Sequence, residues 1–556
     1  MQATPQRRFF SPAGLVLLFW LLNAALYPLL LPLWDGFDEP FHYAYAQHLA
    51  TEGRWPVLGH TPLSKEIDRS LHLAPASHIV RHNLPFVMTF GEFHALPVPE
   101  RQARRESLET IDPGWRTLPQ PGTLNYEAQQ PPLAYLLPAA VDSMAARLPL
   151  VRRVLLARLA VSLAGGALQL WLTLQLASEL GLSVAWQPFV LFLVTSSQMF
   201  YATVSRVSND WLAVPLGTLF FLAMLRFHRQ PGVRHAVILG LAVAAGLLTK
   251  AYFLPWALLA AALVVWSWWR HLAHARAALA AAAAMALALP WYLRNAALYG
   301  SFSGMQQSAA GTGAADTVRA ALSIPWPEVT WAAFRGAVWT GNNSFTSFSS
   351  TTVDIFLLLW LLAGGCWLLT CRRGSLPFAE RLVAAGLAVF FAALLYANAL
   401  FVAHGSATYH VATPWYAQPL AAPCACVACL GMSRVWRAGR WLAPALAALS
   451  AYLICATYFL KLIPLYAGFT ARVSPASLLR WWSNDPAGCF ATLRDTVAGD
   501  VSVVAVLACA VAIAAPAAAV AVCRAAVLSL LREGPHAPDS LSSPSLPGRL
   551  RPAGPL

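Results

Sequence analysis

Long apolar runs separated by short polar segments dominate the pattern of this chain. A transmembrane helix needs about 20 predominantly apolar residues, and about twelve runs approach that length. They lie near residues 12–33, 153–178, 187–204, 209–226, 235–250, 251–269, 276–296, 353–371, 382–402, 413–433, 441–460 and 499–523. The pattern predicts an all-α polytopic membrane protein with about 12 transmembrane helices.

Arginines gather in alternate connections between these runs, at Arg226, Arg229 and Arg234, at Arg270 and Arg276, at Arg372, Arg373 and Arg381, and at Arg434, Arg437 and Arg440. Short cytoplasmic loops carry an excess of Lys and Arg. We therefore expect a multi-pass protein of the plasma (inner) membrane with both termini in the cytoplasm. Residues 34 to about 151 then form a long first extracytoplasmic loop, in which apolar residues at helical spacing predict interfacial helices.

Composition supports the same class. Hydrophobic residues make up 58% of the chain and charged residues 11%, against about 25% charged residues in soluble domains, so a water-soluble enzyme is excluded. The net charge is +14, but it sits in short loops, which membrane orientation explains without a nucleic-acid partner. We expect one membrane domain over 1–533. The Pro- and Ser-rich segment 534–556 predicts a disordered cytoplasmic tail.

Acidic residues cluster where the first loop begins. Asp35, Asp38, Glu39 and His42 share one face if this segment is helical. Crowded carboxylates repel, so at least one is expected to be protonated, bound to a metal or opposite a cation. The cluster is typical of a general base held at the membrane surface. Helix capping by Asp35 or Asp38, with Pro40 in the first turn, explains the same residues structurally, and both interpretations remain open.

The same loop ends in a polar run that includes Glu127 and Gln129 and is followed by Pro131 and Pro132. Paired prolines stop a helix and redirect the chain. That structural role is one interpretation. The other is that the amide and carboxylate groups contact an acceptor at the outer boundary.

Further polar residues fall at the same predicted boundary, namely Arg206, Asp210, Lys250, Arg294, His404 and Tyr409. An ion at membrane depth costs at least ~2.5 kcal/mol, so it tends to face a cavity or a partner. Lys250 lies on the side where cations are scarce, although a snorkelling side chain also explains it. Acids near cations at one boundary favour proton removal from an acceptor, with Lys250, Arg206 and Arg294 binding a departing phosphate.

Two segments of the first loop resemble signatures of the GT-C-fold membrane glycosyltransferases. They are 38–56, with its Asp-Glu-Pro-Phe-His start, and 125–135, with Gln-Gln-Pro-Pro-Leu. The relatives include protein O-mannosyltransferases and lipid A aminoarabinose transferases. The resemblance implies a GT-C-like fold, transfer of a sugar from a polyprenyl-phosphate donor, Asp38 as catalytic base and Glu39 as its acidic partner. It also implies a divalent metal ion as cofactor, which Asp38, Glu39 and His42 would hold.

Several departures from that family pattern exist. Ala134 stands where many relatives carry a second tyrosine, and Thr413-Pro414-Trp415-Tyr416 replaces a glycine-arginine-tyrosine run. Donor contacts after residue 400 therefore do not follow from the resemblance.

The sequence thus predicts a hexosyl- or pentosyltransferase that inverts the anomeric carbon and acts on an extracytoplasmic glycan, lipid or protein. Asp35, His42, Glu127, Gln129, Asp210, His404 and Tyr409 are expected to contact the acceptor or support the site. Three alternatives stay open: a transporter or flippase for a lipid-linked solute, an envelope polysaccharide polymerase or ligase, and a membrane scaffold. A transporter predicts charges spread through the membrane depth and internal repeats, neither of which is evident.

Overall fold

A computed structural model describes residues 11–304, 312–372, 376–405, 414–469 and 475–533. Among these residues, nine helices are long and apolar enough to cross a membrane by length and composition. The chain is therefore an all-α polytopic membrane protein, as its apolar pattern predicts. The nine spans are Pro12–Leu30, Leu150–Glu179, Asp210–Arg229, Ala251–Arg270, Leu272–Tyr299, Ser350–Cys371, Phe378–Ala403, Trp436–Tyr466 and Val501–Arg532.

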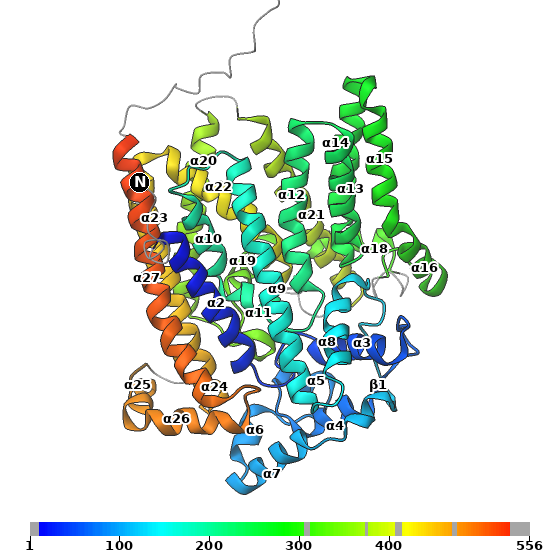
Figure 1. Cartoon of the computed structure of the whole chain (residues 1–556), viewed down its shortest axis with the longest axis vertical. Helices are drawn as coiled ribbons and strands as arrows, with labels where there is room; N and C mark the ends of the chain where they lie inside the picture. Colours follow the sequence, from blue (N-terminus) through cyan, green and yellow to red (C-terminus); the bar gives the residue numbers. More distant parts are fainter. Residues whose placement is uncertain (1–10, 305–311, 373–375, 406–413, 470–474, 534–556) are drawn as a thin grey trace, which may run out of the picture.

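These spans correspond to α2 (Pro12–Leu30), α9 (Leu150–Glu179), α12 (Asp210–Arg229), η3 (Ala251–Phe253) with α14 (Leu254–Arg270), η4 (Leu272–His274) through α15 (Ala275–Met285) and η5 (Ala286–Ala288) to α16 (Leu289–Tyr299), α20 (Ser350–Arg372), α21 (Phe378–Ala403), α23 (Trp436–Ala456) through the π-helical turn η8 (Thr457–Leu462) to α24 (Ile463–Tyr466), and α27 (Val501–Glu533). Most of them run side by side as one bundle (Figure 1).

The remaining three apolar runs are not long continuous helices. The run near 187–204 forms α10 (Gln187–Thr195) and α11 (Gln198–Val204), which break at two serines. The run near 235–250 forms α13 (Val233–Leu247), which ends before Lys250. The run near 413–433 forms the 3₁₀ segment η7 (Pro414–Leu420) and α22 (Ala421–Arg434). Polar residues and prolines interrupt the backbone hydrogen bonding in these runs, so a count of twelve spans does not follow from this structure.

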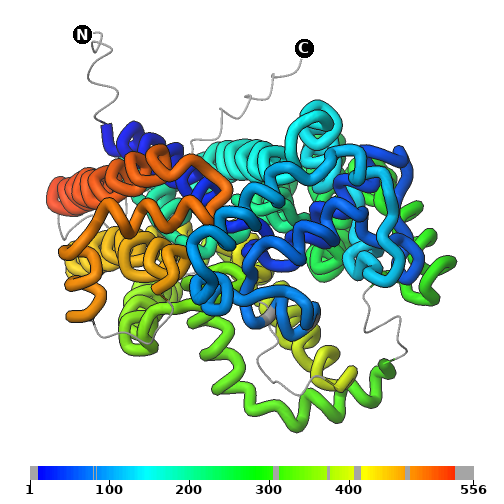
Figure 2. The backbone as a smooth tube through the Cα atoms, turned by 90° about the horizontal axis from the view of Figure 1, so that it is seen from below, coloured from blue at the N-terminus to red at the C-terminus, as the bar shows by residue number. Residues whose placement is uncertain are grey.

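The first loop contains short helices, as its apolar spacing predicts, together with a short antiparallel pair of strands that was not expected. Its elements are α3 (Glu39–Glu52), β1 (Pro62–Ser64), α4 (Lys65–Leu73), α5 (His78–Asn83), α6 (Phe90–Ala95), α7 (Val98–Glu109), η1 (Pro113–Thr117), β2 (Pro119–Leu124), η2 (Leu133–Tyr135) and α8 (Leu136–Met144). Figure 2 shows these blue segments lying across one end of the bundle.

Two later connections contain short helices. They are α18 (Ala314–Ser323), α19 (Trp326–Val338) and η6 (Asn342–Ser344) before α20, and α25 (Pro475–Asn484), α26 (Pro486–Thr492) and η9 (Leu493–Asp495) before α27. The loop from Gly341 to Phe345 packs near the start of α3, because the Asn343 amide donates to the Asp35 carbonyl (2.9 Å). The predicted tail 534–556 lies outside the described residues.

Helix α9 packs against α2, α12 and the first-loop helices α7 and α8. Two adjacent glycines let neighbours approach it closely: a Cβ at Gly165 would lie 2.8 Å from the Trp211 carbonyl oxygen, and one at Gly166 would lie 2.5 Å from Trp20 Nε1. Both spacings are below van der Waals contact, so α2 and α12 can pack this tightly only against glycine. The position of α9 matters because it carries Arg158.

Candidate active site

Asp38 occupies the turn that starts α3. Its backbone lies in the left-handed region, with φ 55°, a conformation that Asp and Asn tolerate better than most residues. The residues before it, Asp35 to Phe37, are buried, whereas Asp38 is half-buried. The Tyr126 hydroxyl donates to its Oδ1, and no Lys, Arg or His of the described residues forms an ion pair with it. Asp38 is thus the accessible carboxylate of the cluster.

Glu39 has a different environment and is fully buried. Arg158 of α9 donates hydrogen bonds to both of its carboxylate oxygens, with Nε 2.8 Å from Oε1. The Val207 amide also donates to Oε1 (3.0 Å). Arg158 further donates to the Leu31 and Pro32 carbonyls, at 2.7 and 2.9 Å. Glu39 therefore joins the end of α2, α9 and the segment after Arg206.

Gly36 is the glycine on which this close packing depends. A Cβ there would lie 2.8 Å from Glu39 Oε2 and 3.0 Å from the Arg206 Cβ. The turn before Asp38 can thus lie directly on the Glu39 carboxylate and beside Arg206 only without a side chain at this position.

Asp35 has different partners from Glu39. Ser344 donates to both of its oxygens (2.8 and 2.9 Å), and the Tyr466 hydroxyl donates to Oδ2. Burial raises the pKa of Asp35 to about 7, although these hydrogen bonds act in the opposite direction. Asp35 therefore ties the site to two segments that are distant in sequence, one before α20 and one at the end of α24.

Arg206, Asp210 and Lys250 form one buried charge group. Arg206 Nη2 lies 2.7 Å from Asp210 Oδ2, and Lys250 Nζ donates to Asp210 Oδ1. The group carries two cations and one anion. Arg206 Nε and Nη1 are buried and have no hydrogen-bond partner in the described part of the chain. An unpaired buried donor costs about 1–3 kcal/mol, so both point to a ligand with acceptor oxygens.

Aromatic rings surround these cations. The Arg206 guanidinium lies 4.7 Å from the Phe37 ring centre and 5.6 Å from that of Trp415, and these two rings stack at 4.0 Å. Lys250 Nζ lies 4.3 Å from the centre of the Tyr416 ring. Ring faces attract cations. Trp415 and Tyr416 come from the stretch after residue 400 for which the family resemblance gave no contacts.

The end of the first loop joins this site. Asn209 Nδ2 donates to Gln130 Oε1 (3.0 Å), and Gln130 Nε2 donates to Glu127 Oε2 (2.8 Å). Burial, with a smaller contribution from the neighbouring Asp38 charge, raises the pKa of Glu127 to about 8, while the charge of Lys250 lowers it. Glu127 thus lies within electrostatic reach of both Asp38 and Lys250. Gln129 is also buried, and its Oε1 has no partner among the described residues.

His42 lies one turn into α3. Its Nδ1 is 2.7 Å from the Tyr135 hydroxyl, and the Tyr135 ring stacks on Tyr45. Burial lowers the pKa of His42, and the nearby charges of Arg206 and Lys250 lower it further. A neutral imidazole at this position orients Tyr135 and adds no positive charge.

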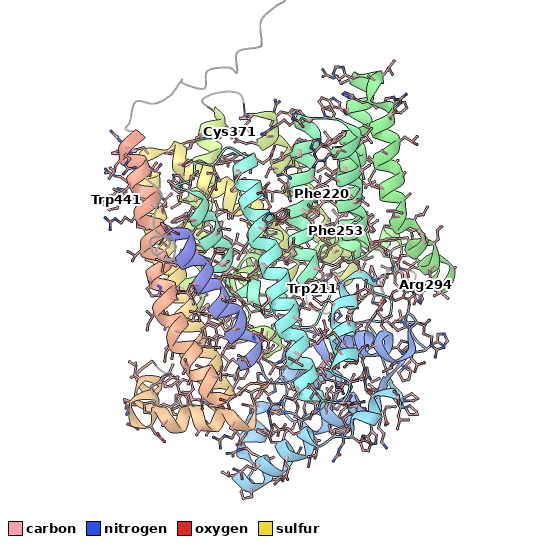
Figure 3. All side chains as sticks on the ribbon, in the orientation of Figure 1. Trp211, Phe220, Phe253, Arg294, Cys371 and Trp441 are labelled. Carbon is pink, nitrogen blue, oxygen red and sulfur yellow. The ribbon has the colours of Figure 1, made fainter. Side chains whose placement is uncertain are left out.

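Three predicted residues are not part of this group. Arg294 donates to the Pro56 carbonyl (3.0 Å) and lies over the Trp291 ring, and Figure 3 shows it at the side of the molecule, apart from Trp211, the neighbour of Asp210. His404 is exposed and 3.2 Å from Thr312 Oγ1. Tyr409 lies outside the described residues.

The predicted metal ligands do not fit a common ion. Arg158 and the Val207 amide occupy the Glu39 oxygens, and Tyr135 occupies His42 Nδ1. Over the described ranges, no group of three or more His, Cys, Asp or Glu side chains is placed to hold a metal ion.

Sequence reasoning missed four residues of this site: Tyr126, Arg158, Trp415 and Tyr416. An available signal for Arg158 was its place inside the apolar run 153–178, where a charged residue needs a buried partner. The aromatic pair carries no charge and has no comparable signal.

No protein-family model matches this chain, and no curated protein matches it. Among solved structures, the chain is similar to "Crystal Structure of ArnT from Cupriavidus metallidurans bound to Undecaprenyl phosphate". The identity is 14% and the TM-score 0.45, and the match covers 96% of this chain and 77% of that chain. A likeness of this size does not establish activity or ligands, so the function has to come from the site itself.

Proposed function

We propose that this chain is a membrane glycosyltransferase that moves a hexose or pentose from a polyprenyl-phosphate donor to an acceptor outside the cytoplasm. The observation that carries the proposal is the pair of unpaired buried donors on Arg206, which shares Asp210 with Lys250 and packs against Gly36 in the turn before Asp38. The resemblance of the two first-loop segments to GT-C-fold glycosyltransferases supports it.

The charge group suits a phosphate monoester or diester. Arg206 presents Nε and Nη1, which lie on different edges of the guanidinium, so each can donate separately to an acceptor oxygen of a phosphate. Lys250 is already paired with Asp210, so it contributes as a charge. As the bond between sugar and phosphate breaks, negative charge grows on the phosphate and the preformed donors stabilise it without rearranging.

An apolar cavity lined in part by η7 supports a lipid-linked donor. It has a volume of about 70 Å³ and lies between α19 and α21, with Ala417 and Leu420 of η7 on its wall. Tyr416 of the same segment lies over Lys250. A second apolar cavity of about 290 Å³ lies further along α21, and Leu395 lines both. An isoprenoid tail lying along α21 would contact both cavities, and η7 connects the smaller one to Tyr416 over Lys250.

Asp38 is the base in this mechanism. Its carboxylate takes the proton of the acceptor hydroxyl or amine while that atom bonds to the anomeric carbon, and the polyprenyl phosphate leaves with the bonding electrons. A single displacement inverts the anomeric carbon. Tyr126 holds the Asp38 carboxylate in position. We assign Glu39 a supporting role, since Arg158 occupies its oxygens. General base action contributes ~10²–10⁴ in rate.

We propose that the site faces the extracytoplasmic side of the inner membrane, with both termini in the cytoplasm. Arg229 ends α12 and Arg270 ends α14, at the end of the bundle opposite the first-loop helices (Figure 1). Arginine-rich connections mark the cytoplasmic side, and their position supports this orientation.

The decisive experiment compares wild type with D38N in transfer from a polyprenyl-phosphate sugar, followed by mass spectrometry of envelope glycans, lipids and proteins. Asn also tolerates the left-handed backbone at this position, so D38N removes charge without adding strain. Transfer should fall at least ~10²-fold while donor binding persists. E52Q, at the exposed end of the same helix, is the matched control and should keep wild-type activity.

Normal transfer by D38N would refute the catalytic assignment. Movement of an intact lipid-linked sugar across the membrane, with no new glycosidic bond, would instead establish a flippase. A product lengthened by repeating units would establish a polymerase.

A further inference from the structure

A third cavity lies at the end of the bundle opposite the first loop. Its volume is about 180 Å³, and it lies between the last turns of α12 and α14 and the short segment η4. Its polar lining consists of His228, Ser267, Arg270, His271 and His274, and its apolar wall includes Trp266. No carboxylate lines it, so the cavity presents hydrogen-bond donors and positive charge.

Apart from a contact between Ser267 and His274, these side chains have no hydrogen bond or ion pair within the described part of the chain. Within the described ranges, Arg270 has no ion pair, and its guanidinium lies 5.3 Å from the centre of the Trp266 ring. His228 contacts the rings of Phe378 and Trp266 and forms no hydrogen bond there. His274 Nδ1 is bound to Ser267 (3.0 Å), which leaves its Nε2 free for another partner.

Nearby acids are already neutralised. Glu179 pairs with Arg226 and Arg229. Glu380 receives hydrogen bonds from Arg434 (2.6 Å) and from Trp367 (2.7 Å). The field inside the cavity is therefore positive, and an anion that enters meets no uncompensated carboxylate.

The surface beside the cavity is apolar and aromatic. Trp268 is 44% exposed, Trp269 80% and Leu272 78%. Tryptophans of this kind mark the level of the lipid headgroups. An anion at this height, with apolar surface directly beside it, has the chemistry of a lipid headgroup joined to acyl chains.

We propose that this cavity binds the phosphate of an anionic glycerophospholipid, with its acyl chains lying over Trp268, Trp269 and Leu272. Basic pockets between transmembrane helices are a recurrent form of headgroup site. The site is separate from the proposed glycosyltransferase site and does not depend on that function.

The test is native mass spectrometry of the purified full-length protein in detergent, with added phosphatidylglycerol, phosphatidylethanolamine or inorganic phosphate. Phosphatidylglycerol should bind one per chain and more tightly than phosphatidylethanolamine. The double variant R270Q/H271Q should lose at least about fivefold in affinity, the loss expected for one cation near a membrane surface. R276Q removes an exposed arginine that does not line the cavity and should bind as wild type does.

A second variant guards against a general loss of structure. R270K keeps the charge and should retain most of the binding, and all variants should keep the wild-type unfolding midpoint. Equal binding of the two lipids, displacement of phosphatidylglycerol by inorganic phosphate, or unchanged binding by R270Q/H271Q would each overturn the proposal. Loss of binding in R276Q as large as in the double variant would do the same.

Discussion

The ion pair between Arg158 and Glu39 provides the sharpest test of how this site is held together. Both side chains are fully buried, so R158M leaves the Glu39 carboxylate uncompensated inside the protein. Breaking a buried pair by removing one partner costs about 3–5 kcal/mol. The lost donations to the Leu31 and Pro32 carbonyls add to the same change.

The double variant R158M/E39M separates the charge from the packing. It contains no unpaired charge, and it leaves the Val207 amide without its acceptor, which costs about 1–3 kcal/mol. It should therefore be more stable than R158M. Together with E39M it completes a double-mutant cycle, in which we expect a coupling of at least about 2 kcal/mol.

The assay is unfolding in mixed micelles, measured for wild type, both single variants and the double variant. R152M is the matched control because Arg152 is exposed on the same helix, and it should unfold as wild type does. If R158M matched R152M, or if the double variant were no more stable than R158M, the pair would not clamp the site.

Three further predictions concern phosphate binding, pH and the lipid tail. R206Q should lower kcat/KM for the lipid-linked donor about 10- to 100-fold, because hydrogen bonds to charged groups are worth about 1.5–3 kcal/mol. Initial rates over a range of donor concentrations measure this change, and an unchanged kcat/KM would show that Arg206 does not bind the phosphate. Burial raises the pKa of Glu127 from 4.5 to about 8, so the folded state keeps a proton that the unfolded chain releases. The stabilisation from the protonated Glu127 is present below about pH 4.5 and is lost as the pH rises toward 8. In E127Q the unfolding midpoint should therefore decrease less between these pH values than it does in wild type. The same decrease in both proteins would contradict this assignment. L395W should fill the apolar cavities and raise KM for a long-chain donor more than for a short-chain one. A392W, on the exposed face of the same helix, is the control. An equal effect of L395W on both donors would refute the proposal that these cavities bind the lipid tail.

Several candidate site residues were predicted from local pattern alone. Arg206 and Lys250 stood out because cations are scarce on the predicted outer side, and in the structure both pair with Asp210. Asp35, Asp38 and Glu39 stood out as crowded carboxylates beside an apolar run. These acids would share one face only if the segment were helical from Asp35 onward, whereas Asp38 precedes α3 in a left-handed turn and Asp35 lies before the helix.

The partners of these acids could not be predicted from the neighbouring sequence, because they lie far away along the chain. Glu39 meets Arg158, which lies 119 residues later in the chain, and Asp35 meets Ser344 and Tyr466, which lie 309 and 431 residues later. Arg294 has the same local character as Arg206, yet the packing of α16 carries it to the Pro56 carbonyl.

The sequence by itself determined that this chain is a bundle of membrane-spanning helices with a long polar loop at one end, because the length of an apolar run and the charge beside it are local properties. The tertiary structure decided which of three neighbouring carboxylates is accessible. Burial and pairing depend on side chains that helix packing brings together from distant parts of the chain, so Glu39 and Asp35 are buried against such partners and Asp38 stays half-exposed.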